Sequence, residues 1–219
     1  MLERLIALYQ PHVSRFVVVV SQPFVAPALE CAGAATETPV DVCVQERPTG
    51  MLDAVLQARA VVEASDADRV WISWCDQIAI HPSTAARLAD LSDANPNAGI
   101  VMPVVIRRQP YIHFDRDNAG RIVGIRHRRE GDVMPDVGEG DAGLFSLSRD
   151  AYLQELPIYA ATVERGAATG ERNLLPFIPW MAERNGVVTF PCEDEMESVG
   201  INTQDDLQAV ETYLRTRGR

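Results

Sequence analysis

The sequence predicts an α/β fold in which a mostly parallel sheet is wrapped by helices. Apolar runs alternate along the chain with segments whose apolar residues recur every three or four positions, and this alternation builds parallel sheets. The run 16–20 (FVVVV) is continuously apolar, as expected for a strand covered on both faces. A length of 219 residues fits one ordinary domain, so we expect residues 1–219 to form a single unit.

The first half of the chain is expected to alternate between helices and strands. Helices are predicted where apolar residues have helical spacing, and strands where apolar residues follow one another without interruption. The predicted order is helix 1–10, strand 15–21, helix 23–33, strand 40–45, helix 51–64, strand 69–75, helix 82–91 and strand 98–106.

The second half predicts an inserted hairpin before the alternation resumes. Strands at 111–115 and 121–127 are joined by 117–120 (DNAG), a turn sequence. Residues 131–140 are expected to form a loop over the site. The predicted order is then strand 142–146, a helix from about 149, helix 174–184, strand 186–190 and helix 204–217. Thr203 is a candidate N-cap for the last helix.

The net charge and the composition limit the classes of binding partner that are expected. The formal net charge is −11, so a polyanion such as DNA would be repelled and we expect no nucleic-acid partner. Arginine is the only permanently cationic side chain because the chain has no lysine, and arginine suits bidentate phosphate binding. The balance of apolar and charged residues indicates a soluble protein and leaves a homo-oligomer open.

The sequence also indicates where in the cell the protein is expected. No apolar stretch approaches the ~18 residues of a membrane span, and no basic segment leads into an apolar one at the N-terminus. The four cysteines are scattered without a C-x-x-C pair, which makes a zinc site or a disulfide framework unexpected. We therefore expect a cytoplasmic protein without a membrane partner.

Asp76 is the first candidate functional residue. It follows the buried-looking strand 70–75 (VWISWC), so its carboxylate is expected at the carboxyl edge of the sheet, where open α/β sheets bind ligands. A carboxylate there is a natural ligand for a hard divalent cation that carries a phosphate. The alternative is an ordinary strand-end aspartate that caps the following turn.

Three segments together resemble the nucleotidyltransferases that include the sugar-1-phosphate nucleotidyltransferases and their molybdenum-cofactor relatives. The segments are 45–58 (QERPTGMLDAVLQA), 74–77 (WCDQ) and 200–207 (GINTQDDL). The resemblance implies a three-layer, Rossmann-like fold of the GT-A-like type. It also implies a Mg²⁺ cofactor, held by Asp76 and Asn202 as metal and catalytic residues.

The resemblance extends to the substrate contacts. It implies that Gln45, Thr49 and Gly50 bind the nucleotide base, although the last two could simply form a helix entry. Two fainter segments, 139–145 (EGDAGLF) and 169–176 (TGERNLLP), are similar to family segments near the acceptor. They imply acceptor contacts from Glu139, Asp141, Gly143 and Glu171. Asp141 stands where the family has Asn, which puts an N-acetylated hexosamine acceptor in doubt.

The sequence departs from the family pattern at its N-terminal end. Family members begin with a strand and a glycine-rich loop that wraps the triphosphate, whereas residues 1–6 (MLERLI) resemble the helix that follows it. The first, central strand is therefore expected to be missing. Three explanations remain open: a misassigned or trimmed start, a non-catalytic relative, or a strand supplied by another chain.

The expected function is Mg²⁺-dependent transfer of a nucleoside monophosphate. The donor is a nucleoside triphosphate, the acceptor is a small phosphorylated molecule such as a sugar 1-phosphate, and pyrophosphate is released. Positioning and electrostatics carry such a reaction without a protein nucleophile. The alternative is a non-catalytic nucleotide-sugar-binding or regulatory module. A related glycosyltransferase would need a D-x-D pair, which 75–77 (CDQ) lacks.

Overall fold

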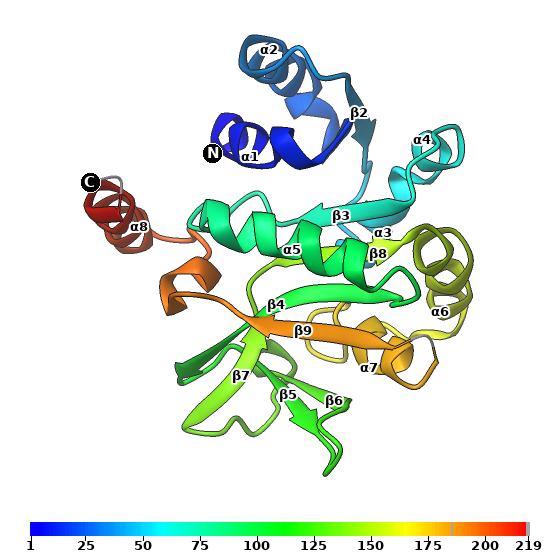
Figure 1. The fold of residues 1–219 in the computed structure, drawn as a ribbon, viewed down its shortest axis with the longest axis vertical. Helices are drawn as coiled ribbons and strands as arrows, with labels where there is room; N and C mark the ends of the chain where they lie inside the picture. Colours follow the sequence, from blue (N-terminus) through cyan, green and yellow to red (C-terminus); the bar gives the residue numbers. More distant parts are fainter. Residues whose placement is uncertain (185, 218–219) are drawn as a thin grey trace.

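The computed structural model describes residues 1–184 and 186–217, and its centre is a five-stranded sheet (Figure 1). The strands are β3 (Arg69–Ser73), β4 (Ile100–Arg108), β7 (Val137–Asp141), β8 (Leu144–Ser148) and β9 (Val187–Pro191). Strand β8 lies between β3 and β4 and is antiparallel to both, whereas β9 is parallel to β4. The α/β class is confirmed, but the prediction of a mostly parallel sheet was wrong for this sheet, which is mixed: β7 and β8 are antiparallel to their neighbours, and β4–β9 is a parallel pair.

Strands β7 and β8 follow one another along the same edge of β4. Strand β7 pairs with the second half of β4, and β8 pairs with its beginning, both antiparallel. Only Ala142 and Gly143 separate them, and Gly143 has a φ of 68°, a left-handed conformation that glycine adopts without a steric penalty. This kink lets β8 turn aside and pair with β3 as well, so irregular backbone stands in the middle of the sheet.

Helices cover both faces of the sheet and complete the three layers (Figure 1). One apolar cluster combines Ile100 and Met102 of β4 with helices α3 (Met51–Gln57), α4 (Arg59–Glu63), α6 (Leu156–Thr162) and α7 (Phe177–Ala182). The other combines Val101 with helices α1 (Leu2–Tyr9), α5 (Pro82–Ala94) and α8 (Gln204–Arg217). Neighbouring residues of β4 enter opposite clusters because side chains alternate along a strand.

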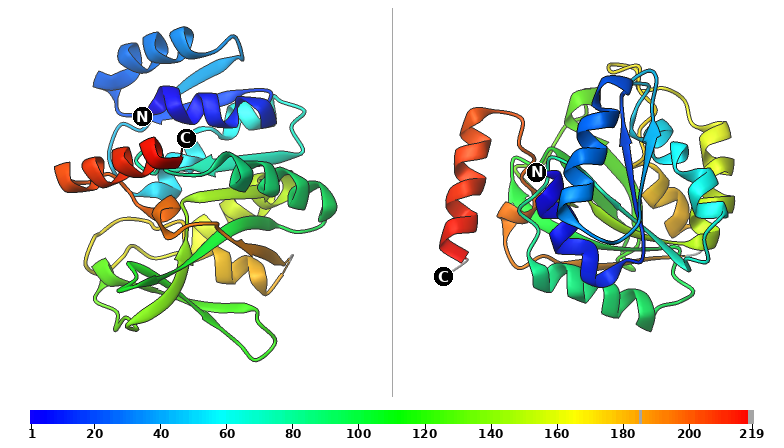
Figure 2. Two further views of the ribbon diagram at one scale, coloured as in Figure 1. Left: turned by 60° about the vertical axis from the view of Figure 1, so that its left-hand side comes forward. Right: turned by 90° about the horizontal axis from the view of Figure 1, so that it is seen from above.

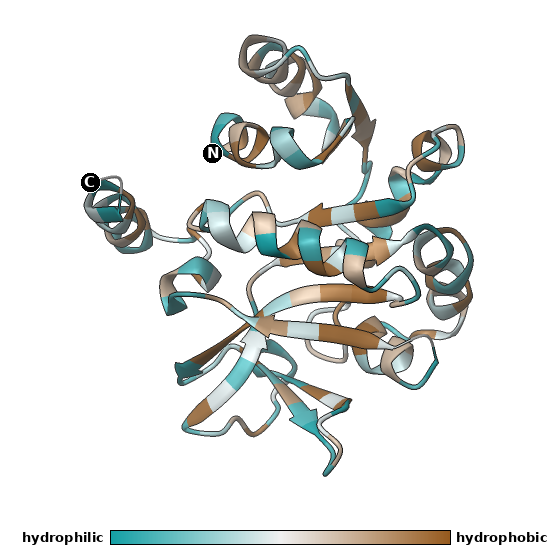
Figure 3. Ribbon diagram, viewed as in Figure 1, coloured by the Kyte–Doolittle hydropathy of each residue, from teal (hydrophilic) through white to brown (hydrophobic). Residues whose placement is uncertain are grey.

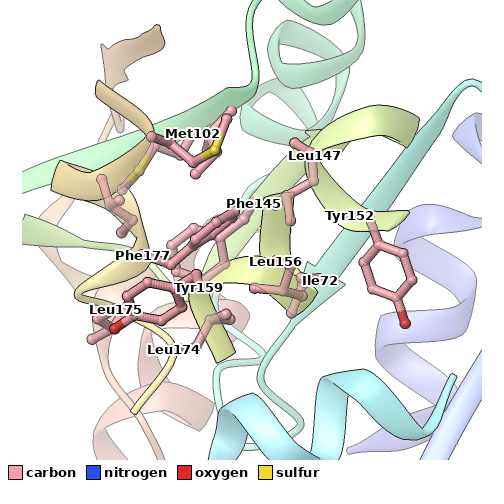
Figure 4. Close-up of a cluster of buried hydrophobic side chains, with 14 of the residues drawn as sticks. Ile72, Met102, Phe145, Leu147, Tyr152, Leu156, Tyr159, Leu174, Leu175 and Phe177 are labelled. Carbon is pink, nitrogen blue, oxygen red and sulfur yellow. The ribbon is translucent and has the colours of Figure 1, made fainter. Parts of the chain in front are cut away.

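The first of these clusters is rich in aromatic side chains. Figure 4 shows Tyr159 of α6 beside Phe177 of α7, and their ring centroids are 5.3 Å apart. Hydropathy follows the same division, because the strands of the central sheet carry long brown segments and the outer faces of the helices carry teal (Figure 3). Strand β3, which leads to Asp76, contributes the buried side chain of Ile72 to this cluster.

A second, smaller sheet lies apart from the first. Strands β1 (Phe16–Val20) and β2 (Val40–Val44) pair in parallel and are joined by helix α2 (Val25–Ala35). Figure 2 shows this unit and α1 on the far side of β3 from the rest of the central sheet. Within the described residues, neither β1 nor β2 pairs with any strand of the central sheet.

The predicted hairpin is present but forms a sheet of its own. Strands β5 (Ile112–Arg116) and β6 (Ile122–His127) pair antiparallel, and the amide of Gly120 donates to the carbonyl of Asp117 at 2.9 Å in the turn. The hairpin packs closely on β7: a β-carbon added to Gly140 would lie only 2.7 Å from the carbonyl oxygen of Ile112. Among the described residues, β5 and β6 do not pair with any strand of the central sheet.

Two predicted elements were wrong in detail. The predicted helix 51–64 is two helices that meet at Ala58, and the predicted loop 131–140 ends in strand β7. The other predicted elements are present with shifted ends. The short helical turns are η1 (Gln10–His12), η2 (Gln22–Phe24), η3 (Arg128–Glu130), the π-helical η4 (Ala151–Glu155) and η5 (Glu195–Ser198). No helix within 1–184 or 186–217 is long and apolar enough to cross a membrane.

Candidate functional site

The candidate site lies where β3 ends and the β7–β8 kink begins. The amide of Trp74 donates to the carbonyl of Gly143 at 3.1 Å, and the amide of Gln77 closes a turn onto the carbonyl of Trp74 at 3.3 Å. These bonds hold Asp76 in a tight turn against the kink. A β-carbon on Gly143 would overlap the Gln77 side chain and lie 2.6 Å from Cδ1 of Trp74. Only glycine therefore fits at this position.

Asp76 and Asn202 come together here from distant parts of the sequence. The amide of Ile201 donates to the carbonyl oxygen of Asp76 at 3.0 Å, which docks the segment before α8 on the β3 turn. A β-carbon added to Gly200 would lie 2.7 Å from Oδ2 of Asp76 and 3.3 Å from Nδ2 of Asn202. The two side-chain atoms are therefore separated by no more than the sum of these distances, which is shorter than the ~8 Å screening length in physiological salt.

Asp206 fixes the Asn202 segment in place. Its Oδ2 accepts hydrogen bonds from the amides of Asn202 and Thr203 at 3.1 and 2.8 Å, and from the Thr203 hydroxyl at 2.8 Å. The amide of Asp206 in turn donates to Oγ1 of Thr203 at 3.1 Å, so the predicted N-cap is confirmed. The hydrogen bond from Thr203 lowers the pKa of Asp206, which keeps it ionised as the acceptor of all three bonds.

Asp141 brings a second carboxylate to the site. It ends β7 and is buried, and its Oδ1 accepts a hydrogen bond from the amide of Gly143 at 2.8 Å. Burial raises the pKa of Asp141 to about 6, and the nearby charge of Asp76 adds to the rise. Burial also raises the pKa of Asp76. Two neighbouring acids that both resist ionisation form a site that favours a cation.

Two further side chains carry unsatisfied polar atoms into the same region. Gln77 donates from Nε2 to the carbonyl of Ser198 at 3.2 Å, and Arg107 donates from Nη1 to the Ser198 hydroxyl at 3.4 Å. Oε1 of Gln77 and Nε of Arg107 are buried without a protein partner. The sequence analysis did not single out either residue. The position of Gln77 beside Asp76 was the only available signal.

The donor set suits a hard divalent cation. Asp76 and Asp141 offer carboxylate oxygens and Asn202 offers an amide oxygen, which are the ligand types that Mg²⁺ prefers. Among the described residues, no group of three or more His, Cys, Asp or Glu is arranged to enclose a metal ion. Mg²⁺ needs only a few ligands from the protein when phosphates and water supply the remaining ones.

The three residues expected at the base form a rigid entry to α3. Nε2 of Gln45 donates to the carbonyl of Gly50 at 3.0 Å, and the amide of Arg172 donates to the carbonyl of Thr49 at 2.8 Å. Gly50 has a φ of 120° and lies against the backbone of Arg172. Met51 and later residues of α3 line the large cavity beside Asp76, whereas Gln45, Thr49 and Gly50 do not line it.

The residues expected at the acceptor are divided by the structure. Asp141 and Glu171 line the same cavity as Asp76, together with Tyr111, His127 and Arg129. Glu139 instead forms an ion pair with Arg116, in which the guanidinium donates at 2.5 and 3.0 Å. Glu139 therefore does not lie with Asp141 and Glu171, although it is close to Asp141 in the sequence.

Comparison with known proteins gives three similarities. The model of the MobA-like NTP transferase domain matches residues 1–136. The bifunctional protein GlmU of Heliobacterium modesticaldum is 26% identical over 178 residues, which are 80% of this chain and 38% of GlmU. The chain thus spans well under half of that relative.

The third similarity is structural. The crystal structure of HddC from Yersinia pseudotuberculosis superposes with a TM-score of 0.61 at 13% identity, covering 97% of this chain and 84% of HddC. At this level of identity the likeness establishes a common fold only.

Proposed function

Because the chain belongs to the MobA-like NTP transferase family, we propose that it transfers a nucleoside monophosphate from a nucleoside triphosphate to a small phosphorylated acceptor, with release of pyrophosphate. The observation that carries this proposal is the approach of Asp76 and Asn202 at the carboxyl end of β3. Ligands of open α/β sheets bind at this edge. The GlmU relative is itself described as bifunctional, so its activities come to this chain only as part of the proposal.

The cofactor in this proposal is Mg²⁺, held by Asp76 and Asn202, with Asp141 close enough to interact with Asp76 through its charge. When bound, the ion supplies charge neutralisation for the phosphates at the reacting centre. The protein's own part is to place the oxygen ligands, and the hydrogen bonds of Asp206 and Ile201 do so from behind the site.

The acceptor would occupy the cavity between Asp141 and the loop that carries Glu171. Arg107 and Arg129 line the cavity and can neutralise an acceptor phosphate. Burial lowers the pKa of His127, so its neutral ring is available for hydrogen bonding near pH 7. Gln45, Thr49 and Gly50 remain the residues proposed for the base, at the start of α3.

The direct test is release of pyrophosphate from each common nucleoside triphosphate, with Mg²⁺ and a set of sugar 1-phosphates as acceptors. The expected result is Mg²⁺-dependent turnover with one preferred triphosphate. Asp76→Asn should lower the turnover by ~10²–10³-fold, the range seen when one charge-stabilising group is removed. Asp90→Asn on the exposed face of α5 is the matched control and should retain full activity.

Two results would contradict the proposal. Equal turnover in the Asp76 and Asp90 variants would separate the activity from the candidate site. Thermal stabilisation by a nucleotide without turnover under any condition would identify a binding module instead.

A further inference from the structure

His127 ends β6 and lines the cavity on the acceptor side, where three neighbours hold it. Its backbone amide donates to Oδ2 of Asp132 at 2.7 Å. The ring of Tyr111 meets the imidazole edge-on, with ring centroids 5.1 Å apart and 77° between the ring planes. Nδ1 of His127 lies 3.0 Å from Nδ2 of Asn173. These contacts fix both the position and the rotation of the ring.

The orientation of the Asn173 side-chain amide follows from a backbone donor. The amide of Leu175 donates to Oδ1 of Asn173 at 3.0 Å, and a backbone N–H group can only donate. The oxygen of the Asn173 amide is therefore directed at Leu175, and its NH₂ group faces His127. Because an NH₂ group of an amide does not accept hydrogen bonds, Nδ1 of His127 is the acceptor in this contact.

The Asn173 contact assigns the ring proton of His127 to one nitrogen. Burial lowers the pKa of His127, so the ring is neutral near pH 7 and carries a single N–H group. Since Nδ1 accepts from Asn173, the proton lies on Nε2. Among residues 1–184 and 186–217, Asn173 is the only hydrogen-bond partner of this ring. The Nε2–H group is therefore available to a ligand in the cavity.

The segment that carries Asn173 is anchored to the entry of α3. The amide of Arg172 donates to the carbonyl of Thr49 at 2.8 Å, and the amide of Leu52 donates to the carbonyl of Arg172 at 3.2 Å. The guanidinium of Arg172 forms an ion pair with Asp53. Every second residue from 169 to 175 lines the cavity, whereas Arg172 does not. Arg172 thus holds the segment from behind while Asn173 faces the cavity.

We propose that Asn173 is a positioning residue that holds His127 as the Nε2–H tautomer, and that this N–H group donates to an oxygen atom of the phosphorylated acceptor. The identity of the ligand rests on the proposed function, whereas the tautomer does not. A neutral ring with a fixed donor favours ligand oxygens that can accept a hydrogen bond. It disfavours a group that can only donate, such as an ammonium group.

The tautomer can be measured by nitrogen-15 NMR of the labelled full chain, because ring nitrogens with and without a proton have well-separated shifts. The proton-free nitrogen of His127 is expected to be Nδ1. Loss of signals in His127→Gln identifies the ring. His113 is the internal reference, because its Nδ1 accepts from the amide of Glu139 at 3.2 Å and it does not line the cavity.

Two substitutions of Asn173 separate its hydrogen bond from its packing. Asn173→Asp keeps the shape and can still accept from Leu175, but a carboxylate cannot donate, so the ring proton should move to Nδ1. Asn173→Ala removes more volume and imposes no tautomer, so it should not reverse the pattern. Spectra are recorded about one pH unit above the measured pKa of His127 in each variant, where the ring is neutral. Asn118→Asp adds the same charge in the hairpin turn and should leave the tautomer unchanged.

The ligand contact is tested with the acceptor that best supports pyrophosphate release, or with glucose 1-phosphate if no acceptor does. Addition of this probe should shift the Nε2 signal of His127 and leave the signals of His113 unchanged. His127→Gln retains an N–H donor near the position of Nε2, and calorimetry should show its affinity for the probe within about threefold of the parent. His127→Leu has no donor and should lose at least about tenfold.

Two sets of results would overturn the inference. A parent protein with its ring proton on Nδ1, or an Asn173→Asp variant with an unchanged tautomer, would exclude the positioning role of Asn173. An Nε2 signal that does not move throughout the titration, or equal affinities of His127→Gln and His127→Leu, would exclude the ligand contact. Failure of the proposed function is distinct, because it would leave the expected tautomer and probe shift in place without pyrophosphate release.

Discussion

The amide of Ile201 donates to the carbonyl oxygen of Asp76 at 3.0 Å, and this bond joins the start of α8 to the end of β3. It aligns backbone rather than side chains. The Asn202 side chain is oriented separately, since its Nδ2 donates to the carbonyl of Gly200 at 3.2 Å and leaves the amide oxygen as the atom available to a ligand. A site assembled by backbone docking keeps its geometry when a side chain is replaced. Substitutions of the two side chains should therefore report on ligand binding rather than on folding.

Asp206 is expected to act as a positioning residue for Asn202. Asp206→Ala removes the three hydrogen bonds that its Oδ2 accepts and frees the segment before α8. We expect the affinity for Mn²⁺, measured by calorimetry as a stand-in for Mg²⁺, to fall by about tenfold, as when residues behind a metal ligand are replaced.

A variant of the neighbouring Asp205 distinguishes the loss of the hydrogen bonds of Asp206 from the loss of a negative charge. Asp205→Ala removes the same charge from the same helical turn, and it should leave Mn²⁺ affinity nearly unchanged. Equal losses in the two variants would show that the effect is one of overall charge.

Gly143 is expected to tolerate no side chain. Gly143→Ala would force a β-carbon into the Gln77 side chain at a φ of 68°, and such strain costs about 1–3 kcal/mol. Gly33 in α2 is the matched control, because a β-carbon there meets no atom within 4 Å, and Gly33→Ala should stabilise by about 0.5–1 kcal/mol. Chemical denaturation measures both. Two variants of equal stability would contradict the described kink.

The raised pKa of Asp141 predicts that the stability of the metal-free protein depends on pH in an unusual direction. Its pKa is about 6 in the folded state, compared with ~3.9 for an ordinary aspartate. Between these values the folded state binds more protons than the unfolded state, so stability falls as the pH rises. The loss is on the order of 2–3 kcal/mol and is complete above about pH 6.

Asp141→Asn should remove this dependence, because its amide oxygen can still accept from Gly143 and does not ionise. Urea denaturation at pH 4.5 and pH 7.5 with a chelator present tests it. The variant should exceed the parent in stability at pH 7.5. A parent protein that gains stability across this range, with the variant following it, would place Asp141 in a solvated environment instead.

Much of the fold could be predicted from the sequence because its signals are local. Continuous valine marks β1, and helical spacing marks α1. Strand β7 could not be predicted this way, since its sequence VGEGD is poor in strand-forming residues. It is a strand because β4 extends to Arg108 and offers an edge for it to pair with. Such pairing depends on tertiary structure.

The candidate site also contains residues that the sequence identified and residues that only the tertiary structure reveals. Asp76 and Asn202 were found from short motifs, and the structure places them together. Their roles stay a prediction, as do those assigned to Gln45, Thr49 and Gly50. The charge interaction between the buried Asp141 and Asp76 depends on the β7–β8 kink, where the amide of Trp74 donates to the carbonyl of Gly143. Because the sequence predicted a loop at 131–140, no strand register was available from which to infer that Asp141 lies near Asp76.

The most direct test of the shared cation is a double-mutant cycle on Mn²⁺ affinity. Asp76→Asn and Asn202→Ala should each weaken binding by at least tenfold. The double variant should lose less than the product of the two, because both residues hold one ion. Affinity that is unchanged in either single variant, or losses that multiply independently, would contradict a shared site and remove the basis for the proposed reaction.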